Sequence, residues 1–233
     1  MPDPVGRPGP ALRPPHGRPA VVIAGGPRVS LELVRKSLAA GDFLLCTDSG
    51  GTVAVRLGVL PDLLLGDFDS LPPGDARWLE ERGCPRWQFP VEKDKTDLEL
   101  ALDHLLAAGA GDVTVTGALG GRFDHSLANL NLLSRFEARG LRVGLDDGSE
   151  RAFLVRPGEV ARIEGRPGLT VSLFSATPRC RGITLTGFKY PLSAATLAHG
   201  STLGVSNQLV APAGTVTLTA GRLIVVVADL AGT

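Results

Sequence analysis

Residues 20–26, which read AVVIAGG, decide the fold class: five small or branched apolar residues run into two glycines. An uninterrupted apolar run of this length predicts a strand buried on both faces. Similar runs follow at Phe43–Thr47, Leu63–Gly66 and Val113–Thr116. The first part of the chain is therefore built on short buried strands.

Helical patterns separate these runs, near residues 29–40, 52–58, 74–82, 97–108 and 125–138. In the fourth pattern, apolar residues recur at the spacing of an amphipathic helix: Leu98, Ala101, Leu102 and Leu105. Strands that alternate with helices predict an α/β domain with a mainly parallel, Rossmann-like sheet covered on both faces. Such sheets bind ligands beyond the carboxyl ends of their strands.

The pattern changes near residue 147, after which short strands are separated by glycine and proline. Residues 215–219 alternate with period two, the pair Ala220-Gly221 predicts a tight hairpin turn, and residues 223–227 form the expected return strand. This region is expected to be a small antiparallel sandwich or barrel. We predict a disordered proline-rich tail over residues 1–19, an α/β domain over 20–146 and an all-β domain over 147–233.

The composition excludes several classes of protein. The chain has 233 residues, 24 basic and 24 acidic, with 43% hydrophobic residues. A neutral, apolar-rich chain is neither generally disordered nor a binder of nucleic acid. Three widely spaced cysteines form no disulfide framework, so we expect the cytoplasm. No apolar run approaches the roughly 20 residues of a membrane helix, so no membrane partner is expected.

Two aspartate segments follow predicted strands. Asp48-Ser49-Gly50-Gly51 follows the second strand, and its glycines would let the backbone approach a ligand, although a plain turn explains the segment equally well. Asp67 and Asp69 follow the third strand, two residues apart, so both carboxylates point to one side if the backbone is extended. Such a pair suits Mg²⁺ held together with substrate phosphates, and the alternative is that both only cap turns.

Two further charged segments lie at predicted helix starts. Thr96 and Glu99 fit a capping box. Lys93 and Lys95 at the same helix start are expected to meet phosphate oxygens, and Asp97 is expected to bind the cation; a solvated turn is the alternative. Residues 117–125 read GALGGRFDH, in which glycines after a strand precede Arg122 and Asp124 and indicate an anion site.

Together these segments resemble the thiamine pyrophosphokinase (thiamine diphosphokinase) family. The matching stretches run in order from about residue 20 to residue 227: residues 48–51, 61–70, 95–99, 120–125, 187–192 and 205–208. The resemblance implies an N-terminal α/β domain, a C-terminal β-sandwich and a homodimer with active sites at the subunit interface. The implied reaction transfers pyrophosphate from ATP to the hydroxyl of thiamine, giving thiamine diphosphate and AMP, with Mg²⁺.

The resemblance also implies roles for individual residues. Catalysis and metal binding are expected from Asp67, Asp69 and Asp97, and thiamine binding from Ser206 and Asn207. Nucleotide contacts are expected from Asp48, Ser49, Gly50, Gly51, Lys95, Thr96, Gly121, Arg122 and Asp124. Any aromatic stacking from the all-β domain would come from Phe188 or Tyr190. One departure is Gln208, where the family commonly has glutamate.

Two other functions fit the same aspartates. One is a metal-dependent nucleotide phosphohydrolase or phosphotransferase, and the other is a non-catalytic sensor of thiamine or nucleotide. Formation of AMP only in the presence of thiamine separates the kinase from the first, and binding without turnover identifies the second.

Overall fold

The computed structural model describes residues 16–229, which divide into two compact units with a boundary between Gly148 and Ser149. Most of the predicted tail, residues 1–15, lies outside the described residues. The prediction of disorder is wrong for residues 17–19. Gly17 N donates to Gly109 O at 2.8 Å and Phe43 N donates to Pro19 O at 3.0 Å, because this segment extends the backbone pairing of the first strand.

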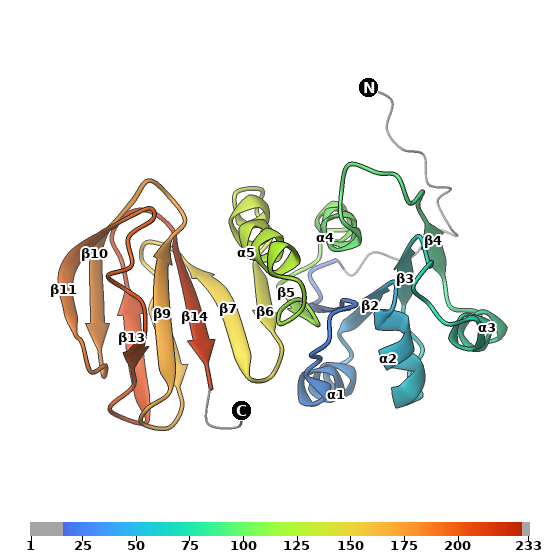
Figure 1. The fold of residues 1–233 in the computed structure, drawn as a ribbon, viewed down its shortest axis with the longest axis horizontal. Helices are drawn as coiled ribbons and strands as arrows, with labels where there is room; N and C mark the ends of the chain where they lie inside the picture. The colour runs from blue at the N-terminus through green and yellow to red at the C-terminus, as the bar shows by residue number, and fades with distance from the viewer. Residues whose placement is uncertain (1–15, 230–233) are drawn as a thin grey trace. The chain divides into compact units, whose positions relative to one another are not determined.

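The first unit contains a parallel sheet in the order β6-β5-β1-β2-β3-β4 (Figure 1). Its strands are β1 (Ala20–Ile23), β2 (Phe43–Thr47), β3 (Leu63–Gly66), β4 (Arg86–Gln88), β5 (Val113–Thr116) and β6 (Val143–Asp146). The four apolar runs are therefore confirmed as strands. The sequence analysis missed β4 and β6, which are short and less uniformly buried.

Helices cover both faces of this sheet, with α1 and α2 on one side and α4 and α5 on the other (Figure 1). Their bounds are α1 (Leu31–Ala40), α2 (Gly50–Leu57), α3 (Pro73–Glu81), α4 (Asp97–Ala107) and α5 (Phe123–Glu137). All five lie within two residues of the predicted patterns, and the apolar stripe of α4 is buried as expected. Within residues 16–229 no helix is both long and apolar enough to cross a membrane.

The strand order places a ligand site. From β1 the chain adds β2, β3 and β4 on one side and then returns to add β5 and β6 on the other. The connections after β1 and β5 therefore leave neighbouring strands in opposite directions. Such a switch point opens a crevice at the carboxyl ends of the strands, where ligands bind in sheets of this kind.

The core beside β1, β2 and β3 is apolar and includes two of the cysteines. Its buried members are Val21, Ile23, Val34, Leu44, Cys46, Ala54, Leu64, Leu71, Leu79 and Cys84. All three cysteines of the chain are free and buried.

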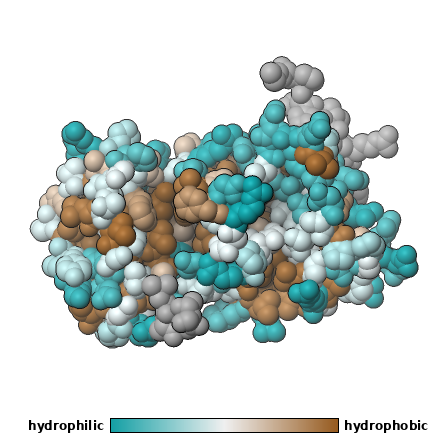
Figure 2. Space-filling view, viewed as in Figure 1, coloured by the Kyte–Doolittle hydropathy of each residue, from teal (hydrophilic) through white to brown (hydrophobic). Residues whose placement is uncertain are grey.

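The start of α5 leaves apolar side chains in solvent. Phe123 is 82% exposed, and Leu127, one turn later, is 48% exposed. Figure 2 shows hydrophobic surface over α5 beside hydrophilic side chains. Two large apolar residues one helical turn apart form a continuous exposed strip.

The second unit consists of two antiparallel sheets that share one core. The first sheet has the order β12-β9-β14-β7 and the second the order β11-β10-β13-β8. The strands are β7 (Glu150–Val155), β8 (Ala161–Glu164), β9 (Thr170–Ser175), β10 (Arg179–Thr186), β11 (Leu192–Ala198), β12 (Asn207–Gln208), β13 (Ala213–Thr217) and β14 (Leu223–Ala228). Buried residues from both sheets form one cluster, which agrees with the predicted all-β region.

The predicted hairpin at Ala220-Gly221 is wrong. β13 pairs with β8 and β10, whereas β14 pairs with β7 and β9, so the turn carries the chain from one sheet to the other. Burial alternates along both strands, although every residue of β14 is apolar, and their buried faces meet across the shared core. Each strand buries one face when the two strands lie in sheets that stack on one another. The turn residues alone do not distinguish this arrangement from a hairpin in which the two strands pair.

Close backbone approaches at the carboxyl edge of the parallel sheet depend on glycine. A Cβ on Gly26 would collide with the carbonyl of Gly117, and a Cβ on Gly50 would collide with the carbonyl of Ile23. Backbone atoms cannot move aside as a flexible side chain can. The loops after β1, β2 and β5 are therefore packed directly against one another.

We predict that Gly50→Ala lowers the free energy of unfolding by at least about 2 kcal/mol, because the new methyl group overlaps with backbone. The matched control is Gly74→Ala in α3, where no atom lies within 4 Å of the added Cβ. That change should leave stability within about 1 kcal/mol of wild type. Chemical denaturation of both variants tests the prediction, and equal stabilities would contradict it.

Candidate active site

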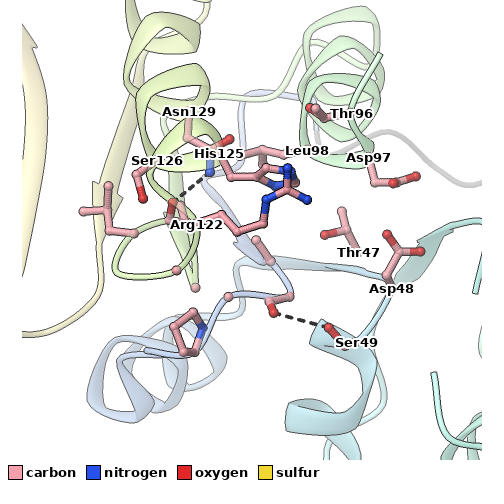
Figure 3. A pocket seen from close by; sticks show the side chains of 18 of the residues that line it. Thr47, Asp48, Ser49, Thr96, Asp97, Leu98, Arg122, His125, Ser126 and Asn129 are labelled. Carbon is pink, nitrogen blue, oxygen red and sulfur yellow. Dashed lines mark hydrogen bonds between the residues drawn. The ribbon is translucent and has the colours of Figure 1, made fainter. Parts of the chain in front are cut away.

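A cavity of about 360 Å³ lies at the switch point of the parallel sheet (Figure 3). It is bounded by the loops that follow β1, β2 and β5 and by the starts of α4 and α5. Six of the predicted site residues line it: Asp48, Ser49, Thr96, Asp97, Gly121 and Arg122. Segments far apart in sequence thus meet at the place that the topology indicates.

Gly50 and Gly51 pack closely against the sheet. Gly50 packs against the backbone of β1, and Gly51 faces the side chains of Leu64 and Leu71. Both residues are buried. Their small size therefore joins α2 to the sheet, and the expected nucleotide contact of their backbone stays a prediction.

Gly66 makes room for the Asp48 carboxylate. Asp48 follows β2 with a positive φ of 43°, and its Oδ1 accepts a hydrogen bond of 3.3 Å from Phe68 N. A Cβ on Gly66, whose φ is 149°, would overlap with that same Oδ1. The glycine at the end of β3 is thus needed both for its backbone angle and for the neighbouring carboxylate.

Asp48 and Asp97 form a crowded pair of acids. In Figure 3 their carboxylates face one another, from the turn after β2 and from the first turn of α4. Burial, followed by the negative charge of Asp97, raises the pKa of Asp48 to about 7. A site that raises a carboxyl pKa this far favours either a proton or a metal ion beside it.

Asp67 and Asp69 do not share one direction. Phe68, between them, has a φ of 67°, so the backbone turns instead of remaining extended. Asp67 Oδ1 accepts a hydrogen bond of 3.2 Å from Asp69 N, and Asp69 is exposed. The extended-backbone argument is therefore wrong, and the turn-capping alternative describes Asp67 Oδ1 correctly.

Lys93, one of the two lysines that the sequence analysis places before α4, contacts two of the three predicted metal ligands. Its Nζ lies 2.9 Å from Asp67 Oδ2 and 3.3 Å from Asp97 Oδ1. Burial is the largest effect on Asp67 and opposes its ionisation, but the hydrogen bonds from Lys93 and from Asp69, together with the charge of Lys93, outweigh it and lower the pKa of Asp67. The same carboxylates outweigh the effect of burial on Lys93 and raise its pKa.

Lys95, the lysine predicted to bind nucleotide, points elsewhere. Its Nζ pairs with Asp103 Oδ2 at 2.9 Å, and Asp103 also pairs with Arg139. Thr96 caps α4 as predicted, its hydroxyl accepting a hydrogen bond of 3.2 Å from Glu99 N. Of the two lysines in this turn, Lys93 is therefore the one that meets the acidic residues.

The acidic residues match the donor chemistry of a hard cation. In residues 16–229 no three His, Cys, Asp or Glu side chains form a ready metal cage. Mg²⁺ is usually held by one or two carboxylates together with substrate phosphates, so such a cage is not required. Asp97 Oδ1 is a buried carboxylate oxygen that lacks hydrogen-bond geometry to any described residue. A buried oxygen ligand of this kind, beside Asp48, fits a Mg²⁺ ion.

Asp147 holds the glycine-rich loop after β5, and the sequence analysis missed it. Its buried carboxylate accepts hydrogen bonds from the backbone N–H groups of Gly117, Ala118 and Leu119, at 2.8, 3.3 and 2.7 Å. These amides point at the protein's own carboxylate, so they are not available to phosphate. The sequence does contain a signal for this role, an aspartate directly after β6, but the sequence analysis used residue 147 only to mark a domain boundary.

Arg122 and Asp124 pair with each other at the start of α5. Arg122 Nη2 lies 2.6 Å from Asp124 Oδ2 and its Nε lies 3.1 Å from Oδ1. Both side chains are exposed, although Arg122 also lines the cavity. The predicted anion site thus contains one arginine, already paired, and no free backbone amides from residues 117–119.

In the second unit, Asn207 supports a loop. Its Oδ1 accepts a hydrogen bond of 3.0 Å from Tyr190 N, and its Nδ2 donates one of 2.7 Å to Tyr190 O. Phe188 is buried in the core, whereas Tyr190 is exposed. Neighbouring Ser206 has a φ of 61°. Of the two aromatic candidates, only Tyr190 presents its ring to solvent.

The chain matches two family models in succession. The model "Thiamin pyrophosphokinase, catalytic domain" matches residues 34–153, and "Thiamin pyrophosphokinase, vitamin B1 binding domain" matches residues 160–223. Thiamine pyrophosphokinase of Bacillus subtilis is 31% identical over 205 residues, which are 88% of this chain and 96% of that protein.

Solved structures agree. The crystal structure of thiamine pyrophosphokinase from Bacillus subtilis has a TM-score of 0.79 and 30% identity, covering 91% of this chain and 100% of that chain. The corresponding structure from Geobacillus thermodenitrificans has a TM-score of 0.75 and 30% identity, covering 91% and 98%. The resemblance seen in the sequence motifs is confirmed, and the chain belongs to the thiamin pyrophosphokinase family.

Proposed function

We propose that this protein transfers the β,γ-pyrophosphate of ATP to the hydroxyl of thiamine, giving thiamine diphosphate and AMP. The observation that carries the proposal is the pairing of Asp48 and Asp97 in a cavity at the switch point of the parallel sheet. Phosphoryl transfer depends mainly on positioning and on neutralising charge. A rigid pocket with crowded carboxylates suits such chemistry.

We place Mg²⁺ at Asp48, Asp97 and Asp67. These residues provide oxygen ligands close to the cavity, and Asp69, which is exposed on the turn, would act from the rim. When bound, the cation neutralises phosphate charge and makes the phosphorus easier to attack. Its ligation is completed by phosphates of the nucleotide.

The chain's own groups then bind and orient the substrates. Ser49, Thr96 and Arg122 line the cavity and supply polar contacts for the nucleotide. A carboxylate of the acidic pair accepts the proton that the thiamine hydroxyl loses on attack. Asp147 fixes the loop after β5, so this wall of the cavity does not reorganise during the reaction.

We assign thiamine to the second unit, through Ser206 and Tyr190. Asn207 uses its side chain to hold the backbone of Tyr190, so it positions this surface rather than contacting ligand. The exposed ring of Tyr190 has the ammonium group of Lys189 5.5 Å from its centroid, and we expect a cationic heterocycle to bind the ring in the same way. Because Gln208 stands where the family commonly has glutamate, we expect the cationic ring of thiamine to be recognised by the Tyr190 ring and by hydroxyl groups such as that of Ser206.

Three broader expectations complete the proposal. The strand order supports a Rossmann-like relationship for the first unit, because the site lies at a switch point. Free, buried cysteines support a reducing compartment such as the cytoplasm. The exposed strip of Phe123 and Leu127 supports a homodimer with active sites at the subunit interface, because a monomer gains nothing from such exposure.

We predict that Asp97→Asn lowers turnover by at least about a hundredfold, because it removes charge at the point where the polyphosphate must be neutralised. The measurement is mass-spectrometric detection of AMP and thiamine diphosphate from ATP, Mg²⁺ and thiamine. Asp103→Asn on the same helix is the control, since Asp103 pairs with Lys95 and Arg139 outside the cavity. That variant should stay within about twofold of wild type.

Two results would contradict this assignment. Near-normal activity of a folded Asp97→Asn protein would exclude Asp97 from the chemistry. ATP cleavage that proceeds equally well without thiamine would favour a phosphohydrolase over the pyrophosphotransferase.

Ionisation of Asp48 should make the metal-free protein less stable as pH rises. The folded-state pKa of about 7 exceeds the ordinary value of 3.8, so the folded protein holds a proton that the unfolded chain releases. Stability from this source is present at low pH and is lost as pH rises through about 7. We predict that Asp48→Asn raises the melting temperature in EDTA more at pH 8.5 than at pH 5, because pH 5 lies between the two pKa values and only part of the penalty is present there.

The control for that pH series is Asp69→Asn, an exposed carboxylate in the adjacent turn. It should show no comparable difference between the two pH values. An equal effect of Asp48→Asn at pH 5 and pH 8.5 would show that ionisation of Asp48 carries no penalty.

The dimer is tested by Leu127→Asp. A charge in the exposed apolar strip of α5 should convert a dimer into monomers, because burying an unpaired carboxylate is unfavourable. Light scattering coupled to size-exclusion chromatography gives the mass directly. A wild-type monomer would refute the dimer, and a Leu127→Asp variant that remains dimeric would move the interface away from α5.

A further inference from the structure

The environment of Lys93 is that of a bound cation. Its ammonium group lies within 3.3 Å of three oxygen atoms: Asp67 Oδ2 at 2.9 Å, Pro90 O at 3.1 Å and Asp97 Oδ1 at 3.3 Å. The Lys93 side chain is only 6% exposed, and those of Asp67 and Asp97 are 11% and 19% exposed. Lysine is almost never buried to this extent unless it is paired.

The ammonium group of Lys93 connects the end of β3 to the start of α4, two elements that are separated in sequence. Asp67 follows β3, whereas Asp97 opens α4, and Lys93 lies in the connection between β4 and α4. Lys93 is one helical turn before Asp97, so their contact is local, while its contact with Asp67 spans 26 residues. Lys93 therefore holds the start of α4 against the end of β3.

The charge balance leaves room for a second cation. Asp48, Asp67 and Asp97 bring three carboxylates into one region, and Lys93 is the cation that ion-pairs with two of them there. Lys93 brings one positive charge to three carboxylates, so it does not neutralise the group fully. A cation that approaches Asp97 must share its carboxylate with the ammonium group.

We propose that Lys93 is a resident counter-ion: it holds Asp67 and Asp97 in place in the metal-free protein and competes with a divalent cation for the same two carboxylates. This inference rests on the metal site proposed above. It makes Lys93 a positioning residue with two opposing effects. Lys93 stabilises the empty site, and for the same reason it weakens binding of a metal ion without nucleotide.

An ordinary structural ion pair would have only the first effect. Removing Lys93 would then lower stability, disorder the carboxylates and leave metal binding unchanged or weaker. Competition predicts the reverse for the metal, because losing a positive charge a few ångströms away makes the site more attractive to a cation. The direction of the change in metal affinity therefore separates the two explanations.

The experiment measures Mn²⁺ binding by isothermal titration calorimetry in the absence of nucleotide, together with thermal melting in EDTA. Lys93→Met should lower the melting temperature of the metal-free protein and bind Mn²⁺ roughly tenfold more tightly than wild type. Lys93→Arg, which keeps the charge, should restore both properties toward wild type. Lys93→Gln, which is polar but uncharged and fits the site more easily, should show the same tightening as Lys93→Met.

The matched control is Lys95→Met, which removes the same charge from the same turn but breaks only the pair with Asp103. It should leave Mn²⁺ affinity within about twofold of wild type. Unchanged or weaker Mn²⁺ binding by both Lys93→Met and Lys93→Gln would overturn the counter-ion role and leave the metal site standing. Absence of Mn²⁺ binding in wild type and in every variant without nucleotide would overturn the competition, and absence of Mn²⁺ binding with ATP present would overturn the metal site as well.

Discussion

The structure of the first unit is organised around mutual repulsion between carboxylates at one edge of the sheet. Asp48 and Asp97 come from different elements and face each other in partly buried positions, with Asp67 nearby. Like charges so placed must be offset by protonation, by an ammonium group or by a metal ion. The raised pKa of Asp48 and the buried position of Lys93 are two of these responses in the same site. The third response, a metal ion, is the one that we propose accompanies the polyphosphate substrate.

The rest of the cavity is held by contacts that leave little freedom. Gly26 lets the loop after β1 touch the loop after β5, and Gly66 gives the Asp48 carboxylate its space. Asp147 occupies three backbone amides that a glycine-rich loop would otherwise offer to phosphate. Glycine-rich segments after strands therefore have two distinct uses here, close packing of backbone and space for a neighbouring carboxylate. In the proposed function, phosphate is bound by side chains together with a cation.

The spacing of apolar residues predicted the helices and strands, which depend on local burial. It did not predict side-chain directions and strand pairing, which depend on how distant segments of the chain fold together. All five helices and four strands follow from apolar spacing, because burial is repeated at the period of the element. The direction of Asp67 relative to Asp69 depends on one residue, Phe68, whose positive φ no pattern indicates. The choice between Lys93 and Lys95 likewise depends on how the turn before α4 folds over β3. The sheet that each strand joins on either side of Gly221 is decided by the shared core, and the turn residues are compatible with both arrangements.

A neutral chain can still recognise a polyanion and a cation together, because charge acts over the distance of a contact and not over the whole surface. The Debye length in physiological salt is about 8 Å, so exposed charges farther apart than this are largely screened. Inside a partly buried site the same charges act strongly, and each one must have a partner. Carboxylates in such a site repel a free triphosphate, and in the proposed function a divalent cation between the two groups offsets that repulsion.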